Sequence, residues 1–180
     1  LTSFNTTSIE PSAISLHLST APVICNGTNT GFASVTASGG TPGYSYLWSN
    51  GYTYPSGTNF FARDYTVTVR DAHGCSADTA LSITEPPPLV INATAFFITC
   101  PNLHDGHATA NVTGGVPPYT YEWTPTGGNA DSTFNLGIGS HAVKVRDSTG
   151  CVEKDDFYVG ARRPLALSTA VPPVQCFGGN

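Results

Sequence analysis

Charged residues are scarce in this sequence, at 11% of 180 residues, and its seven Lys and Arg residues are scattered. A surface that follows a phosphate backbone needs clustered basic side chains, so we expect no nucleic-acid partner. The longest apolar runs, such as residues 93–98, are far shorter than the roughly 20 residues of a membrane-spanning helix. We therefore expect no membrane span in this segment.

Methionine is absent, and the sequence starts at Leu1. We therefore expect a mature or excised segment without an initiator, signal peptide or targeting segment. Catalytic motifs are also missing, since there is no Gly-x-Ser-x-Gly, no His-Glu-x-x-His and no phosphate-binding loop. The sequence predicts a protein that is not an enzyme and needs no cofactor.

Glycine and proline, by contrast, are plentiful, with 19 and 14 residues, and Ser, Thr and Asn are frequent. This balance is typical of secreted all-β modules and unfavourable for long helices. Alternating apolar and polar residues, as in Tyr-Thr-Val-Thr-Val-Arg at 65–70, predict short strands with one buried face.

A turn followed by an aromatic strand occurs twice in the sequence. Gly-Gly-Thr-Pro-Gly-Tyr-Ser-Tyr-Leu-Trp fills residues 39–48, and Gly-Gly-Val-Pro-Pro-Tyr-Thr-Tyr-Glu-Trp fills residues 114–123. Alternate residues of a strand share a face, and this even spacing favours a core role over a sugar-stacking surface. The predicted core residues are Tyr44, Tyr46, Trp48, Tyr119, Tyr121 and Trp123, together with Val67, Val69, Val143 and Val145.

The repeat period near 75 residues divides the chain into units. We predict the last strand of a preceding repeat at 1–11, β-sandwich repeats at 12–87 and 88–163, and the start of a further repeat at 164–180. The fold class is all-β, with tandem antiparallel sandwiches of the immunoglobulin or polycystic-kidney-disease-repeat type. Proline in the short junctions favours extended chain, so the units should form an extended array.

The five cysteines follow the same period. Two of them occur per unit, and the partner of the last one would lie beyond Asn180, which accounts for the odd number. Regular cysteines in small β units predict disulfides and an extracytoplasmic location rather than metal binding. The predicted disulfide cysteines are Cys25, Cys75, Cys100, Cys151 and Cys176.

Two pairings of these cysteines remain open. The preferred one joins Cys25 to Cys75 and Cys100 to Cys151, within each unit. In a standard sandwich, however, the turn after the first strand and the turn before the last lie at opposite ends, too far apart for a bond. In that case Cys25 would bond Cys151 across the junction.

Taken together, these motifs resemble the SprB repeat of Bacteroidetes surface adhesins. The resemblance rests on Cys before an Asn-Gly turn, Gly-Gly-x-Pro-x-Tyr-x-Tyr-x-Trp, Asp-x-x-Gly-Cys and a last strand ending in Glu-Pro. It implies long cell-surface or secreted proteins, associated with the outer membrane, exported by type IX secretion and used in adhesion, gliding motility or extracellular filaments. Neighbouring repeats, other copies in a fibre and surface polysaccharide are the implied partners. The second unit departs from the pattern, because Gly-Ala-Arg-Arg-Pro replaces Glu-Pro at 160–164.

The tandem units and their stiff proline-bearing junctions predict structural spacer repeats of a surface adhesin or extracellular fibre. The alternative is a polysaccharide-binding module of a larger secreted protein. Asp78-Thr79-Ala80 also resembles a Bacteroidetes O-glycosylation acceptor, which makes Thr79 a candidate for glycosylation. Asp71 and Asp147 fit turn capping better than calcium binding, because a calcium site needs six or more oxygen ligands. His104 and His107 have no histidine counterparts in the first unit, so we expect loop variation there rather than a metal site.

Overall fold

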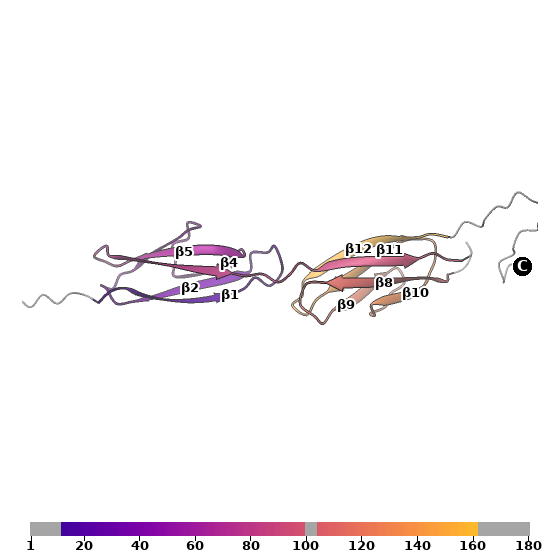
Figure 1. Ribbon diagram of the computed structural model, residues 1–180, viewed down its shortest axis with the longest axis horizontal. Coiled ribbons are helices and arrows are strands. Elements are labelled where there is room, and N and C mark those ends of the chain that lie inside the picture. The colour runs from indigo at the N-terminus through magenta and orange to yellow at the C-terminus, as the bar shows by residue number, and fades with distance from the viewer. Residues whose placement is uncertain (1–11, 100–103, 162–180) are drawn as a thin grey trace, which may run out of the picture. The chain divides into compact units, whose positions relative to one another are not determined.

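A computed structural model describes residues 12–99 and 104–161 of the chain. The described residues form twelve β-strands (Figure 1). Within these ranges, no helix has the length and hydropathy that a membrane crossing would require. The chain divides into unit 1, residues 1–86, and unit 2, residues 87–180, and each is considered by itself.

Unit 1 is a sandwich of two three-stranded sheets, with strand orders β1-β2-β4 and β3-β5-β6. All pairings within these sheets are antiparallel. Its strands are β1 (Ser15–Ala21), β2 (Gly31–Ser38), β3 (Ser45–Trp48), β4 (Ser56–Phe60), β5 (Arg63–Arg70) and β6 (Ser76–Ile83).

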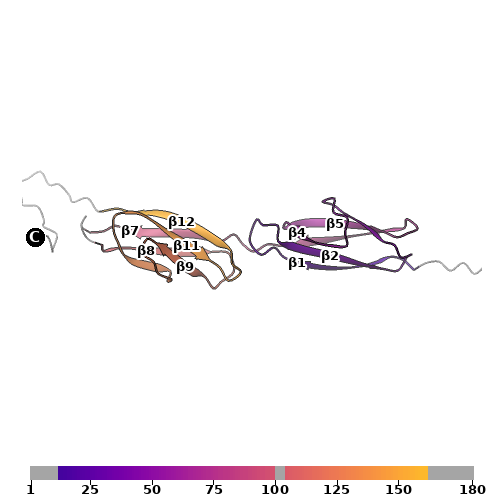
Figure 2. The same ribbon diagram turned by 180° about the vertical axis from the view of Figure 1, so that it is seen from behind.

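Unit 2 repeats this arrangement, with sheets ordered β10-β8-β7 and β12-β11-β9. Figure 2 shows β7 and β12 side by side where the two sheets meet. The prediction of tandem antiparallel β-sandwiches is confirmed. The strands are β7 (Val90–Phe96), β8 (Gly106–Thr113), β9 (Thr120–Thr124), β10 (Ser132–Leu136), β11 (Gly139–Arg146) and β12 (Val152–Val159).

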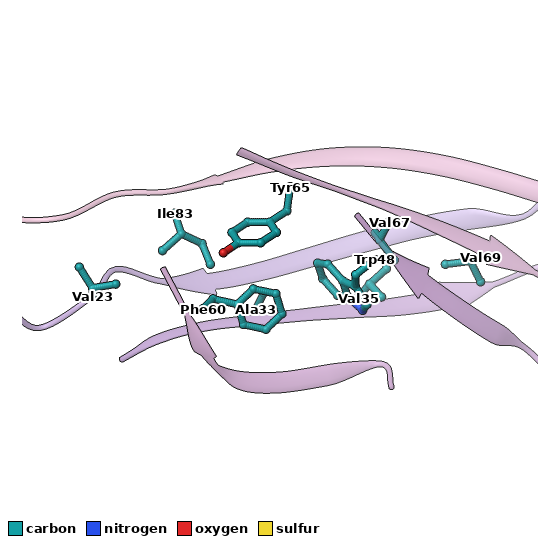
Figure 3. Packing of buried hydrophobic residues seen from close by; sticks show 9 residues of the cluster. All are labelled: Val23, Ala33, Val35, Trp48, Phe60, Tyr65, Val67, Val69 and Ile83. Atoms are coloured by element: carbon teal, nitrogen blue, oxygen red, sulfur yellow. The ribbon is translucent and has the colours of Figure 1, made fainter. Parts of the chain in front are cut away.

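The core of each unit lies between its two sheets, where the inward faces of the alternating strands meet. Figure 3 shows this packing in unit 1, with Ala33 and Val35 from one sheet opposite Val67 and Val69 from the other. Trp48 is 1% exposed, and its Nε1 donates a hydrogen bond to the carbonyl of Tyr54 at 2.9 Å. The buried indole N–H is therefore satisfied, as burial of a polar group requires.

The aromatic strand contributes its tryptophan to the core and its first tyrosine to a hydrogen bond with the preceding turn. Both tryptophans and all four predicted valines are buried, but the tyrosines are only partly buried and pack against the rim of the core. The hydroxyl of Tyr44 donates to the carbonyl of Gly39, and that of Tyr119 donates to Gly114 at 2.6 Å. The first tyrosine of the motif thus fastens its strand to the preceding glycine turn.

The weakly patterned stretch before β5 contains β4, which is joined to β2 through an irregular register. Asn59 has a φ of 72°, and its counterpart Asn135 in β10 has a φ of 61°. Asparagine tolerates this left-handed conformation better than most residues. The bulge interrupts the alternation in both units, which explains why the sequence pattern is weak there.

Candidate functional site: the two cysteine-bearing ends of each unit

One buried carboxylate joins the two characteristic turns of unit 1. Asp71 is 7% exposed, and its Oδ2 accepts a hydrogen bond from the N–H of Thr41 at 3.0 Å. Its Oδ1 accepts from the N–H groups of His73 and Cys75, both at 2.9 Å. The Gly-Gly-x-Pro turn and the Asp-x-x-Gly-Cys turn are therefore held together, and we call this the proximal end, since Ser12 also lies there.

The proximal end of unit 2 has the same geometry. Asp147 is 4% exposed and accepts hydrogen bonds from the N–H groups of Val116, Thr149 and Cys151, each at 2.9 Å. The hydroxyl of Thr149 adds a fourth bond at 2.8 Å. The aspartate of each unit thus caps both turns and fixes the backbone at a cysteine.

The double glycine is required by the close approach of this carboxylate. Gly39 and Gly40 have φ values of 76° and 57°, a region that disfavours side chains. A Cβ on Gly40 would also lie 2.8 Å from Oδ2 of Asp71, and one on Gly115 would lie 3.0 Å from Oδ2 of Asp147. The glycines and the aspartate, some 30 residues apart in the sequence, therefore form one structural motif.

Hydrogen bonding keeps both carboxyl groups ionised. The N–H of Thr41 is the main cause of the lowered pKa of Asp71, and the N–H groups of Cys75 and His73 act in the same direction. Burial opposes ionisation of Asp147, but the N–H of Val116 and the Thr149 and Cys151 donors outweigh it and lower its pKa. The N–H and O–H donors stabilise the aspartate anion itself, whereas a calcium ion would need six or more oxygen ligands around it.

The opposite end of unit 1, which we call the distal end, holds Cys25 in a turn. The N–H and the hydroxyl of Thr28 donate to the carbonyl of Cys25 at 3.1 and 2.7 Å. The turn is fastened to the segment that follows β6, because Asn26 Nδ2 donates to the Pro86 carbonyl at 3.0 Å and the N–H of Gly27 donates to Oε2 of Glu85 at 2.8 Å. The Glu-Pro ending is thus an anchor for the cysteine turn, a role that sequence reasoning missed.

The two cysteines of unit 1 are too far apart to bond. Strand β6 leads from the Cys75 turn to the Cys25 turn, and its eight residues span about 26 Å at roughly 3.3 Å per residue. A disulfide needs Cα atoms within about 7 Å. The predicted pairing of Cys25 with Cys75 is therefore wrong.

The states of the cysteines agree with this geometry. Cys25 and Cys151, the two cysteines of the alternative pairing, are disulfide-bonded. Cys75 is a free thiol with an exposed side chain. Cys100 and Cys176 lie outside the described residues, as do the predicted partial repeats at 1–11 and 164–180.

An aromatic row crosses the outer face of one sheet in unit 2. The ring of His107 on β8 stacks on Phe96 of β7, with centroids 4.1 Å apart and planes at 9°. On the other side of the His107 ring lies the ring of Phe134 on β10, with centroids 6.0 Å apart and planes at 22°. Unit 1 has Ala21 paired with Phe32 at the corresponding positions, so the row is specific to unit 2.

Other residues of interest lie outside this row. Thr79 is half-buried on the inward side of β6. Tyr54 is 66% exposed, while Tyr52 packs over Gly57. Within residues 12–99 and 104–161, no group of three His, Cys, Asp or Glu side chains could hold a metal ion.

Parts of both units match the model of a known protein family. The SprB repeat model matches this chain twice. One match covers residues 18–53 and the other residues 98–130. Each SprB match includes a cysteine, the Gly-Gly turn and the aromatic strand, whereas the capping aspartates lie outside it. The resemblance noted from the sequence is confirmed.

Solved structures of several proteins, among them the following three, are similar to the chain at low identity. No curated protein matches it. A structure explaining Dscam isoform specificity is 14% identical, with a TM-score of 0.36, and the match covers 86% of this chain and 47% of that one. The amphioxus IgVJ-C2 molecule is 15% identical, with a TM-score of 0.32 and coverages of 84% and 98%. Domains 1–6 of the surface layer protein SbsC are 13% identical, with a TM-score of 0.34 and coverages of 87% and 29%. The chain thus spans about half the length of the Dscam chain.

Neutralising the capping carboxylate should destabilise the unit that contains it and reduce the dependence of its stability on pH in acid. The lowered pKa means that the ionised form stabilises the fold fully above the ordinary aspartate pKa of about 3.9, and that this contribution is lost as pH falls through the folded-state pKa. Asp147→Asn should lower the urea midpoint at pH 7 and reduce the loss of stability between about pH 4 and pH 3. Tryptophan fluorescence measures both.

The matched control is Asp156→Asn, because Asp156 is 71% exposed on the neighbouring strand. This variant should behave like the wild type. An Asp147→Asn protein with wild-type midpoints at both pH values would show that the carboxylate does not hold the turns.

Proposed function

We propose that the chain is a non-catalytic spacer that carries tension in a long bacterial cell-surface adhesin or extracellular fibre. The observation that supports this most is the path of the chain through each unit. In unit 1 it arrives at the proximal end, where the Ser12 carbonyl accepts from Gly40, and leaves at the distal end beside Val23. A pull on the two termini is therefore transmitted along the whole unit.

The first and last strands of a unit lie next to each other and run in the same direction. In unit 2, β7 and β12 are neighbours, and Ile98 and Ala161 form a parallel bridge at the distal end. The N–H of Ile98 donates to Gly160 at 3.0 Å, and Val23 donates to Thr84 at the same distance in unit 1. Opposite pulls on these two strands slide them past each other.

When the two strands slide in shear, the hydrogen bonds between them are loaded at the same time. When strands are peeled apart from one end, these bonds break one after another. Asp155 adds to this contact, because its Oδ2 accepts from the N–H of Ala93 on β7 at 2.8 Å. Side-chain anchors of this kind contribute about 1.5–3 kcal/mol each when the acceptor is charged and well shielded. Similarity to the SprB repeat supports a cell-surface or secreted location, export by type IX secretion and a part in adhesion or gliding.

Single-molecule force spectroscopy tests this function. Pulled through its ends, each unit should unfold in a discrete event. The force should exceed the force needed when unit 1 is pulled through residues 63 and 83, which face each other at the open end of the β5–β6 hairpin and would unzip it. Asp155→Ala should lower the unfolding force of unit 2 only.

Asp156→Ala is the matched control, since this side chain pairs with Lys154 on its own strand at 2.8 Å and does not reach β7. It should leave the force unchanged. An end-to-end force no higher than the unzipping force would contradict the spacer function.

A second candidate function, polysaccharide binding, is favoured by the aromatic row of unit 2. Phe96 and Phe134 are 43% and 63% exposed, and Phe134 lies on an edge strand with only one face turned to His107. Exposed aromatic rings suit the apolar faces of sugar rings. The net charge of −5 favours a neutral glycan over an anionic one.

Titration calorimetry of the full chain with cellohexaose, a neutral glucan fragment, tests this candidate. Phe134→Ala should weaken binding about tenfold, equal to about 1.4 kcal/mol, because the exposed ring face is lost. Tyr54→Ala in unit 1 removes an equally exposed ring from outside the row and should not change the affinity. Equal losses in both variants, or no binding by the wild type, would rule against the row as a glycan site.

A further inference from the structure

Cys75 and Cys151 occupy equivalent positions at the proximal ends of their units. Each donates its N–H to Oδ1 of the capping aspartate at 2.9 Å. Each carbonyl accepts from the N–H of the same aspartate at 3.0 Å. The turn therefore holds both cysteines in the same way, whatever their sulfur atoms are bonded to.

The oxidation states of the two sulfurs nevertheless differ. Cys151 is disulfide-bonded, whereas Cys75 is an exposed free thiol. The bond at Cys151 is independent evidence that a cysteine held in this turn is placed to accept a sulfur partner. The other described cysteine of unit 1, Cys25, lies at the opposite end and is itself disulfide-bonded. A partner for Cys75 must therefore come from outside its own unit.

We propose that Cys75 is a linking cysteine that forms a disulfide with the distal-end cysteine of another repeat of this type. Such a cysteine occupies the position of Cys25, before an Asn-Gly-like turn. This inference rests on the proposed spacer function, since it gives the spacer a covalent link to the repeat that adjoins its proximal end. A serial array of such links would carry tension through covalent bonds from one repeat to the next.

The reaction needs an oxidant, which we identify as a low-molecular-weight or protein disulfide such as oxidised glutathione. The Cys75 thiolate attacks one sulfur of this disulfide, and one reduced thiol leaves. The thiolate of the partner cysteine then attacks the mixed disulfide at Cys75 and releases the second thiol. Two protein thiols are oxidised to one disulfide, and the oxidant is reduced to two thiols.

The full chain itself provides a test, because Cys100 and Cys176 follow Cys25 in the repeat register and can serve as partners from a second copy. Incubation in a glutathione redox buffer at rising protein concentration should yield disulfide-linked dimers and longer species. Non-reducing peptide mapping should join the Cys75 peptide to the Cys100 or Cys176 peptide. Cys75→Ser should lose these species and keep the disulfides at Cys25 and Cys151.

The matched control moves the thiol by one residue, in the double variant Cys75→Ser/Ser76→Cys. Ser76 is exposed and is the first residue of β6, so its backbone does not share the two hydrogen bonds that hold residue 75 against Asp71. We expect a thiol at position 76 to be recovered mainly as a glutathione adduct. The proposal is overturned if Cys75 yields only that adduct, links mainly to Cys75 of another copy, or links no better than the moved thiol. Pulling the Cys75→Ser chain tests the spacer function separately.

Discussion

Each unit depends on one carboxylate that is buried among backbone N–H groups. Asp71 and Asp147 each collect three main-chain donors from two turns. Without the carboxylate these part-buried donors would lose a charged acceptor that they share, and the two turns would lose the bonds that join them. The surrounding residues follow from this constraint: the glycines admit the carboxylate, Tyr44 or Tyr119 fastens the glycine turn, and the cysteine lies where the second turn ends.

The proposed spacer function rests on how the two ends of a unit are built. A cysteine turn is fastened at each end, by the aspartate at the proximal end and by Glu85 at the distal end of unit 1. Between these ends, the first and last strands run side by side in the same direction. A pull on the two termini of a unit therefore loads the contact between its first and last strands in shear. This arrangement is expected of a spacer that must resist extension.

Much of the fold could be predicted from the sequence, because strand alternation and the repeat appear directly in its pattern. The inward positions of Trp48 and Val67 follow from the period of two. Three features could not be predicted. The bulge at Asn59 breaks the alternation, the anchoring role of Glu85 depends on a contact with Gly27 far away in the chain, and the Phe96–His107–Phe134 row exists only once the register of three strands is known. The preferred disulfide pairing failed because it followed residue spacing within a unit, whereas the sandwich topology, which places the two cysteine turns of unit 1 at opposite ends, favoured the alternative.

Amide hydrogen exchange at the proximal end tests most directly whether the carboxylate holds the two turns together. In NMR spectra of the wild-type chain near pH 6, the N–H protons of Thr41, His73 and Cys75 should exchange far more slowly than in an unfolded peptide of the same sequence. In the Asp71→Asn chain all three should exchange faster, while Val67 in the core stays protected. Exchange of these three protons at peptide rates in the wild type, or at unchanged rates in Asp71→Asn, would contradict the account.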